Sequence, residues 1–180
     1  SEKDWLTGGK ADAQGTVSGR LCVSGETLLD TSYGTVRIAD LDLVEHPDAT
    51  IETLKGMRRR ITALIYKGRE PMIRVTTYDG RYIECTRGHQ LHTPNGWKYA
   101  GRLDRGSRLT AVAPLRPSPD YPQSGGSQAA VCSIVNIEVR DVWDITVEED
   151  HSYVAQGLVH HNSSGRPNLQ NIVKAVRPIF

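Results

Sequence analysis

Three residues at the two ends of one long segment carry groups that could together rearrange a peptide backbone. The thiol of Cys22 can attack the carbonyl carbon of Leu21, the residue before it, and exchange an amide for a more reactive thioester. The side-chain amide of Asn162 can attack its own backbone carbonyl, close a succinimide and break the bond to Ser163. Ser163 supplies an acceptor hydroxyl directly beyond that bond.

The equilibrium opposes the thioester exchange unless the amide is strained or its leaving nitrogen is protonated. The cyclisation is slow in a free peptide, and a nearby acid–base histidine would accelerate it. His161 and His151 are candidates for accelerating cyclisation of Asn162. Each residue by itself is a weak signal, because a lone cysteine is usually a small buried side chain and an Asn-Ser pair usually forms a turn. Their joint placement at the ends of one segment supports the hypothesis.

The segment between these ends has the pattern of short strands separated by turns. Residues 26–41 predict two strands around the Tyr33-Gly34 turn, and residues 59–93 predict three more, broken at Lys67-Gly68 and at Asp79-Gly80. Asp-Gly between alternating apolar residues is a strong hairpin signal. Further strands are expected in residues 96–103, 107–115, 130–147 and 151–162.

Two stretches depart from this β pattern. Residues 48–57 are the one plausible helix, which Gly56 weakens, and residues 116–128 have the Pro, Ser and Gly content of a surface linker. Residues 1–21 are polar and glycine-rich and read as a flank. No internal repeat is strong enough to use. The pattern therefore predicts an all-β domain.

Composition restricts the class of protein. The net charge of +1 gives no overall field for nucleic acid or a membrane, and no apolar run is long enough to span a bilayer. The first residues have no hydrophobic signal core, so a cytoplasmic protein is expected. The chain has three cysteines, an odd number, and they lack CxxC spacing, which favours a reducing compartment. We expect two of them, Cys85 and Cys132, to pack in strands.

With Cys22 at its start, a Thr86-x-x-His89 motif within it and His161-Asn162 at its end, the segment 22–162 resembles an intein, a self-splicing insert of the Hint (hedgehog–intein) fold. The stretch "CVSGETLLDTSYGTVRIADL" is similar to the first motif of that family, and "CTRGHQLHTPNGW" to the second. The stretch "VRDVWDITVEEDHSYVAQGLVHHN" is similar to the last two. The resemblance implies an all-β horseshoe with pseudo-two-fold architecture, and it implies catalytic roles for Cys22, Thr86, His89, Asp144, His151, His161, Asn162 and Ser163.

The resemblance also implies what each of these residues does. Thr86 and His89 would contact the Leu21–Cys22 peptide, with His89 protonating or destabilising the leaving nitrogen. Asp144 would coordinate the two ends, and His151 and His161 would activate the Asn162 step. No role is implied for His92 or His160, which we expect to be structural. The insert is too short to contain a homing endonuclease as well, and the 116–128 linker is where that domain usually lies.

The flanks 1–21 and 163–180 resemble a different protein. Joined at Leu21 and Ser163 they read "SGRLSSGRPNLQNI", which is similar to a segment of family A DNA polymerases, although Val173 stands where that family usually has proline. The resemblance implies that Arg20, Asn168 and Gln170 contact primer–template DNA after splicing. Splicing itself is expected to need no cofactor, metal or partner, in a monomer without membrane contact.

Three alternatives remain open at this stage. The domain could cleave itself without joining its flanks, or the chain could be a nucleic-acid-binding polymerase fragment with an inert β insertion. A metal site could instead use some of His89, His92, His160, His161 and Cys85, although the spacing fits no standard zinc pattern. Zinc bound to those groups would also inhibit splicing by occupying the catalytic bases.

Overall fold

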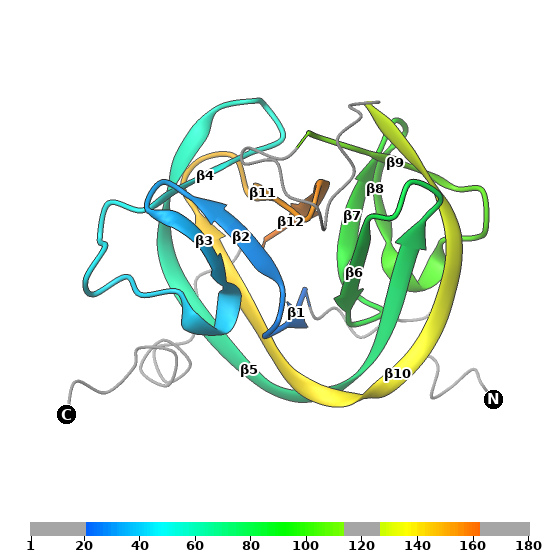
Figure 1. Ribbon diagram of the computed structural model, residues 1–180, viewed down its shortest axis with the longest axis horizontal. Helices are drawn as coiled ribbons and strands as arrows, with labels where there is room; N and C mark the ends of the chain where they lie inside the picture. Colours follow the sequence, from blue (N-terminus) through cyan, green and yellow to red (C-terminus); the bar gives the residue numbers. More distant parts are fainter. Residues whose placement is uncertain (1–20, 114–126, 163–180) are drawn as a thin grey trace.

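The computed structural model describes residues 21–113 and 127–162, and regular structure in them is almost entirely β (Figure 1). The strands fall into two successive series with the same order of elements. Each series has a short strand, a hairpin, one turn of 3-10 helix, a three-residue strand and a 20-residue strand. This order confirms the expected all-β class.

The first series comprises β1 (Val23–Ser24), β2 (Leu28–Thr31), β3 (Gly34–Arg37), the 3-10 turn η1 (Ile38–Asp40), β4 (Thr50–Glu52) and β5 (Arg58–Thr77). The second comprises β6 (Tyr82–Cys85), β7 (Gln90–Thr93), β8 (Gly96–Tyr99), the 3-10 turn η2 (Ala100–Arg102), β9 (Arg108–Thr110) and β10 (Gln128–Val147). A final hairpin, β11 (Ser152–Ala155) and β12 (Leu158–His161), follows.

The two series are arranged around a pseudo-two-fold axis. One six-stranded sheet has the order β4-β5-β6-β1-β10-β9 and the other has β3-β2-β11-β12-β7-β8, so each order is symmetric about its middle. The two long strands β5 and β10 also pair antiparallel along most of their length. Figure 1 shows them curving together around the lower side of the molecule, which gives the horseshoe outline.

The same turn closes the equivalent hairpins of the two series. The Thr31 hydroxyl donates to the carbonyl oxygen of Gly34 at 2.7 Å, and the Thr93 hydroxyl donates to that of Gly96 at 2.6 Å. Both glycines have φ above +100°, which glycine adopts without steric cost. The Tyr33-Gly34 turn predicted from sequence is confirmed, and Asp79-Gly80 likewise joins β5 to β6.

The helix expected at 48–57 is wrong. Thr50–Glu52 form β4, which pairs antiparallel with the start of β5, and Ile51 is fully buried there. Gly56 has φ +74° and donates its N–H to the Thr53 carbonyl, so it closes the turn between the two strands. The β-branched residues Thr50 and Ile51, the burial of Ile51 and the pairing with β5 favour a strand over the weak helical pattern.

The strand break expected at Lys67-Gly68 is also wrong, because β5 runs through both residues. Gly68 has φ +94°, and the pairing of β5 with β10 shifts register between Asp141 and Trp143, opposite this point. A glycine inside a strand pattern commonly marks such an irregularity, at which the strand bends without ending.

The linker expected at 116–128 is too long by at least its last residue, because Gln128 already begins β10. Its part up to residue 126 lies outside the described residues, as do most of the two flanks. Within the described ranges, no helix has the length and apolar character that crossing a membrane requires.

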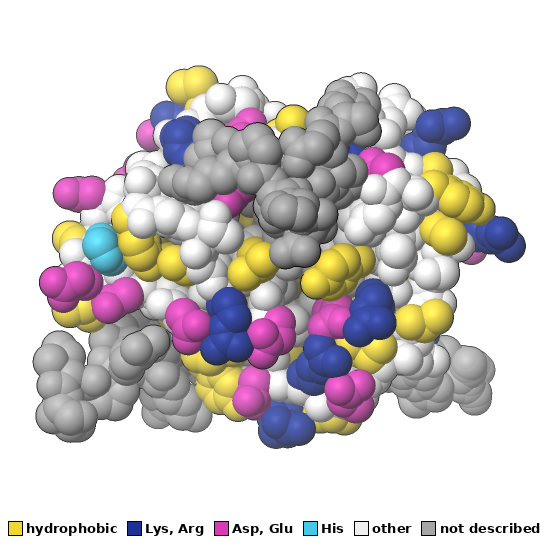
Figure 2. Space-filling view, viewed as in Figure 1, with side chains coloured by type: hydrophobic (Ala, Val, Ile, Leu, Met, Phe, Trp, Pro, Cys, Tyr) yellow, Lys and Arg dark blue, Asp and Glu magenta, His cyan; other side chains and the backbone are white. Residues whose placement is uncertain are grey.

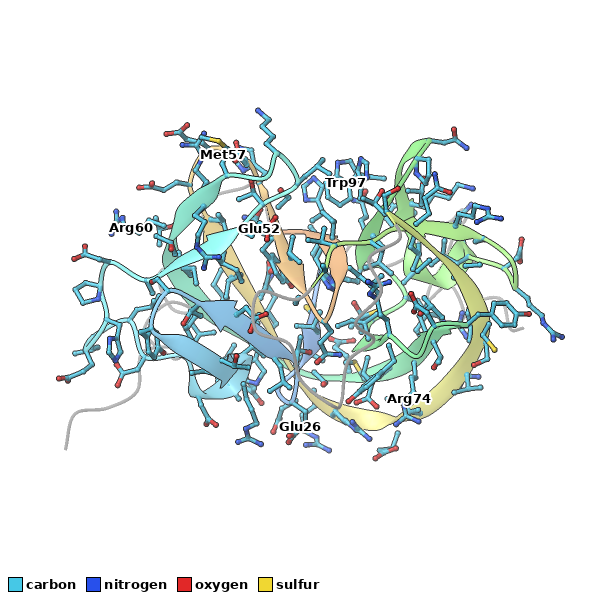
Figure 3. The ribbon with its side chains drawn as sticks, turned by 45° about the horizontal axis from the view of Figure 1, so that its top comes forward. Glu26, Glu52, Met57, Arg60, Arg74 and Trp97 are labelled. Carbon is cyan, nitrogen blue, oxygen red and sulfur yellow. The ribbon has the colours of Figure 1, made fainter. Side chains whose placement is uncertain are left out.

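Figure 2 shows Lys and Arg side chains interspersed with Asp and Glu over the lower part of this face. Ion pairs between the two kinds of side chain include Arg37–Glu26, Arg69–Asp141 and Arg140–Glu138. Figure 3, which is turned from that view, labels Glu26 and Arg74 in the lower part of the molecule. The lower part of this face therefore mixes the two signs of charge, unlike the basic stripe that is typical of a nucleic-acid-binding surface.

Candidate active site

Cys22 lies just before the short strand β1, in the middle of the first sheet. Val23 pairs with Cys85 of β6 on one side and with Trp143 of β10 on the other. Cys22 is fully buried, and continuing the antiparallel register places it opposite Asp144. The structure therefore brings together Cys22 and Asp144 as the sequence predicted, and Asp144 is also fully buried.

The Asp144 carboxylate has a local hydrogen bond that fixes its direction. Its Oδ1 accepts the backbone N–H of Ile145 at 2.8 Å. Asp144 also contributes to the raised pKa of the nearby Tyr153 phenol, after burial, which is the larger cause. A buried carboxylate beside a buried thiol is a polar centre that a purely structural core would avoid.

Thr86 contacts Cys22 through both its backbone and its side chain. The Thr86 N–H donates to the carbonyl oxygen of Cys22 at 3.1 Å, and the Thr86 hydroxyl donates to the same oxygen at 3.4 Å. These contacts lie on the peptide after Cys22, one bond downstream of the Leu21–Cys22 peptide that the resemblance implies. Thr86 therefore fixes the backbone from which the Cys22 thiol projects.

His89 is fixed at the end of the turn that Thr86 begins. Its N–H donates to the Thr86 carbonyl at 3.1 Å, and its own carbonyl accepts the N–H of Ala100 at 2.7 Å. The side chain is fully buried. Burial lowers the pKa of His89 well below its usual value, and the neighbouring His160 and His161 lower it further. His89 is therefore neutral at pH 7 and available as a base.

His160, expected to be structural, is in direct contact with His89. The His89 Nε2 and the His160 Nδ1 are 2.8 Å apart, and the His160 Nε2 lies 3.0 Å from the Ala155 carbonyl oxygen. His160 is fully buried, and its ring stacks on that of Tyr153. The signal in the sequence was a histidine at a position of β12 that otherwise reads as apolar.

His161 and Asn162 form the other end of the site. The His161 Nδ1 lies 2.5 Å from the backbone carbonyl oxygen of Asn162, and a carbonyl only accepts, so Nδ1 carries the hydrogen. The His161 ring packs edge-on against Trp97 of β8, which Figure 3 labels. Asn162 is fully buried. The donor is therefore aimed at the oxygen that becomes negative when the Asn162 side chain attacks that carbonyl.

His151 contacts Asn162 through its backbone. Its carbonyl oxygen accepts the Asn162 N–H at 3.2 Å, while its side chain is exposed. The residue has φ +51°, which is uncommon for residues other than glycine. This backbone contact positions the Asn162 backbone and does not place the His151 imidazole on the reacting amide.

Some of the remaining predicted residues lie within the described part of the chain and others lie outside it. Cys85 and Cys132 lie in β6 and β10 as expected, both as free thiols, and burial raises the pKa of Cys85. His92 contacts the Thr110 hydroxyl at 2.7 Å. The other predicted residues, Ser163, Arg20, Asn168 and Gln170, lie outside the described residues.

The alternative metal site gains no support in the part of the chain that the structure describes. Within residues 21–113 and 127–162, no group of three or more His, Cys, Asp or Glu side chains is placed to hold a metal ion. The His89 Nε2 and the His160 Nδ1 are in hydrogen-bond contact with each other. We therefore interpret these histidines as a hydrogen-bonded pair.

Comparisons with known proteins identify the architecture. No family model matches the chain. A mutant of the Ssp DnaB mini-intein variant M86 superposes with a TM-score of 0.70 at 22% identity, over 86% of this chain and 99% of that one. The DnaB intein of Synechocystis sp. PCC 6803 gives 0.63 at 23% identity, over 79% and 98%. The gp41-1 intein gives 0.63 at 19%, over 78% and 98%. The chain has the Hint fold.

A curated relative matches part of the sequence. The replicative DNA helicase DnaB of Rhodothermus marinus is 31% identical over 93 residues, which are 49% of this chain. The matched part covers only 10% of that helicase, so the chain spans a small part of its relative. The relative is a helicase, so the match lends no support to a polymerase identity for the flanks.

Proposed function

We propose that residues 22–162 excise themselves from the chain and join Leu21 to Ser163 by a peptide bond. One observation supports this most directly: a buried series of contacts connects the two ends of the insert. Thr86 binds the carbonyl of Cys22, His89 binds Thr86, and His160 contacts His89 from the strand that leads into Asn162. Residues far apart in sequence thus share one site.

The first step is an acyl shift at Leu21. The Cys22 sulfur bonds to the Leu21 carbonyl carbon, the bond from that carbon to the Cys22 nitrogen breaks, and the thiol proton ends on the freed amine. Neutral His89 accepts and returns this proton. Asp144, opposite Cys22, would coordinate the two ends while the acyl group moves from Cys22 to Ser163. The Ser163 oxygen then attacks the thioester, and the Cys22 thiol is re-formed as the Ser163 hydroxyl proton moves to sulfur.

The second half releases the insert. The Asn162 side-chain nitrogen bonds to its own carbonyl carbon, while the His161 Nδ1–H stabilises the developing oxyanion. The bond to Ser163 breaks, and the proton that the Asn162 amide nitrogen loses ends on the freed amine of Ser163. That amine then attacks the ester carbonyl carbon, the bond from that carbon to the Ser163 oxygen breaks, and a proton moves from the nitrogen to that oxygen, which leaves an amide and a hydroxyl. Every bond broken is replaced by one formed within the chain, so the sequence of steps uses no cofactor, partner or energy source. A monomer is sufficient.

The flanks remain proposed as pieces of a DNA polymerase. The joined stretch "SGRLSSGRPNLQNI" is the support for a family A host, in which Arg20, Asn168 and Gln170 would contact primer–template DNA. Because the insert separates Arg20 from Asn168, the unspliced host should be inactive. This assignment rests on the flanks of the sequence alone.

A time course of the purified chain in reducing buffer tests the proposal. Intact mass should show the insert 22–162 and a joined flank peptide, and tandem mass spectrometry should locate a Leu-Ser bond within "SGRLSSGRPNLQNI". A matched Ser163→Ala chain should still cleave at both ends but give no joined peptide, because alanine has no acceptor oxygen. Hydrolysed flanks alone from the unsubstituted chain would support self-cleavage without joining. A joined peptide from Ser163→Ala would contradict the mechanism.

A further inference from the structure

The hydrogen bonds of His160 determine which nitrogen of His89 carries a proton. The Ala155 carbonyl oxygen can only accept, so the His160 Nε2 at 3.0 Å must donate its hydrogen. Burial lowers the pKa of His160 to about 4, so its ring is neutral at pH 7 and its Nδ1 has a lone pair. The His89 Nε2, 2.8 Å from that lone pair, must therefore donate.

The other nitrogen of the His89 ring is left as the base. With a hydrogen on Nε2, a neutral His89 has an unprotonated Nδ1. That Nδ1 is buried and has no hydrogen-bond partner among the residues that the structure describes. A buried, unsatisfied acceptor costs stability and is usually retained for a reason. Here it leaves one nitrogen of the ring able to accept a proton.

The position of His160 is itself tightly held. The residue pairs with Leu91 of β7 on one side and with Tyr153 of β11 on the other. Its ring stacks on Tyr153 with centroids 5.0 Å apart and planes inclined by 10°. The titratable groups around the two imidazoles are His161 and Tyr153, and burial keeps the Tyr153 phenol protonated by raising its pKa.

We infer that His160 is a positioning residue that holds His89 in its Nε2–H tautomer, with Nδ1 as the atom that takes the Cys22 proton during thioester formation. The inference rests on the proposed function. When Nδ1 takes that proton, the imidazolium keeps its Nε2–H bond to His160, which stabilises the charged state. His160 lies two residues before Asn162, so the strand that carries the downstream junction also sets the base for the upstream one.

The tautomer can be measured without any reaction. In a Cys22→Ala, Asn162→Ala chain labelled with ¹⁵N in its histidines, NMR shifts at pH 7 should show His89 and His160 both as Nε2–H forms. A scalar coupling should connect His89 Nε2 to His160 Nδ1 across the hydrogen bond. Finding His89 protonated on Nδ1 would overturn the inference whether or not the chain splices.

The kinetic role is tested by separating the two junctions. In an Asn162→Ala background, thiol-induced cleavage at Leu21 reports the thioester. His160→Leu should slow this cleavage by about 10- to 100-fold, less than the roughly 100- to 10,000-fold effect of a complete general acid–base group, because His89 itself is retained. His160→Asn should recover part of the rate, because its Oδ1 can accept from His89 where Nδ1 did. His46→Asn is the matched control, since His46 stacks on Tyr33 away from the cluster.

Cleavage after Asn162, measured in a Cys22→Ala background, should change far less in either His160 variant. Equal losses at both junctions would overturn the inference, because they would indicate general disruption of β12. If His160→Leu does not fold, a rate for His160→Asn as low as that of a His89→Ala chain would overturn it equally. An unsubstituted chain that forms no thioester would contradict the proposed function itself, and the NMR result would still decide the tautomer.

Discussion

Thr86 donates two hydrogen bonds to the carbonyl oxygen of Cys22, one from its backbone and one from its side chain. The backbone bond is the shorter, at 3.1 Å against 3.4 Å for the hydroxyl. Cys22 is thereby held by the residue that directly follows β6, 64 positions further along the sequence. The geometry implies that Thr86 positions the nucleophile. Its hydroxyl contributes the longer, and therefore the weaker, of the two hydrogen bonds.

Thr86→Val should therefore slow thioester formation only modestly. The substitution keeps the shape and the backbone bond but removes one long hydrogen bond, which is worth about 1 kcal/mol and corresponds to about a fivefold change in rate. The measurement is thiol-induced cleavage at Leu21 in an Asn162→Ala background. Thr77→Val is a comparable change in a buried threonine of β5 outside the site. A loss of a thousandfold would show that the hydroxyl acts on the reacting bond itself.

Cys22→Ala should abolish cleavage at Leu21 and leave slow cleavage after Asn162. The reason is that only the Cys22 sulfur can form the upstream thioester, whereas the His161 donor to the Asn162 carbonyl is unaffected. Intact mass over time distinguishes the two cleavages. Cys132→Ala is the matched control, because Cys132 is a free, half-buried thiol of β10. Upstream cleavage that continued at the original rate in Cys22→Ala would refute the assignment of the nucleophile.

His161→Phe should slow cleavage after Asn162 by about 100- to 1,000-fold, the usual cost of removing one oxyanion donor. Phenylalanine keeps the edge-on packing against Trp97 and removes the Nδ1–H that contacts the Asn162 carbonyl. The rate is read in a Cys22→Ala background, and His46→Phe is the control outside the site. A normal rate in His161→Phe would transfer this role to another group, such as the exposed imidazole of His151.

Much of this site could be predicted because its reactive residues stand at the ends of the segment in recognisable motifs. Cys22, Thr86, His89 and Asp144 fall around one buried centre, as those motifs predict. Hairpin turns were equally clear, because Asp-Gly and Tyr-Gly supply the positive φ that these turns need. Such signals are local, so these turns can be predicted from the sequence even when the long-range pairing of the strands is unknown.

What the sequence did not reveal depends on contacts across the fold. The Thr-x-x-Gly turns at Thr31 and Thr93 are structurally equivalent, yet their two hairpins share too few residue types to show a repeat. His160 was read as structural because its contact with His89 joins residues that neither periodicity nor spacing connects. The helix expected at 48–57 failed because pairing with β5 decided the conformation there.

Acid should destabilise the fold through the two buried imidazoles. The folded-state pKa of His160 is about 4 and that of His89 is also lowered, both chiefly by burial, against about 6.5 in the unfolded chain. Between pH 6.5 and 4 the unfolded chain therefore binds protons that the folded chain does not, and stability falls as the pH falls. The His160 contribution alone amounts to about 3 kcal/mol by pH 4.

Urea unfolding of a Cys22→Ala, Asn162→Ala chain from pH 7 to pH 4 measures this effect. Adding His160→Leu should flatten the slope by up to about 1.4 kcal/mol per pH unit over this range, the value for one proton. An unaltered slope in the His160 variant would show that this ring already carries its proton in the folded state.

Cutting the chain within residues 116–126 should leave a pair of pieces that splice in trans. The Pro, Ser and Gly content of this stretch favours tolerance of a break, and the described strands on either side, β9 and β10, pair with each other along Arg108–Thr110. The long strands β5 and β10 would fall in different pieces, 1–122 and 123–180, and their extensive antiparallel pairing should drive association. Mixing the two purified pieces and following the joined peptide by mass spectrometry measures the outcome. Pieces that remain soluble and associate without forming that peptide would contradict the expectation, because they would show that an intact connection is needed to align Cys22 with Asn162.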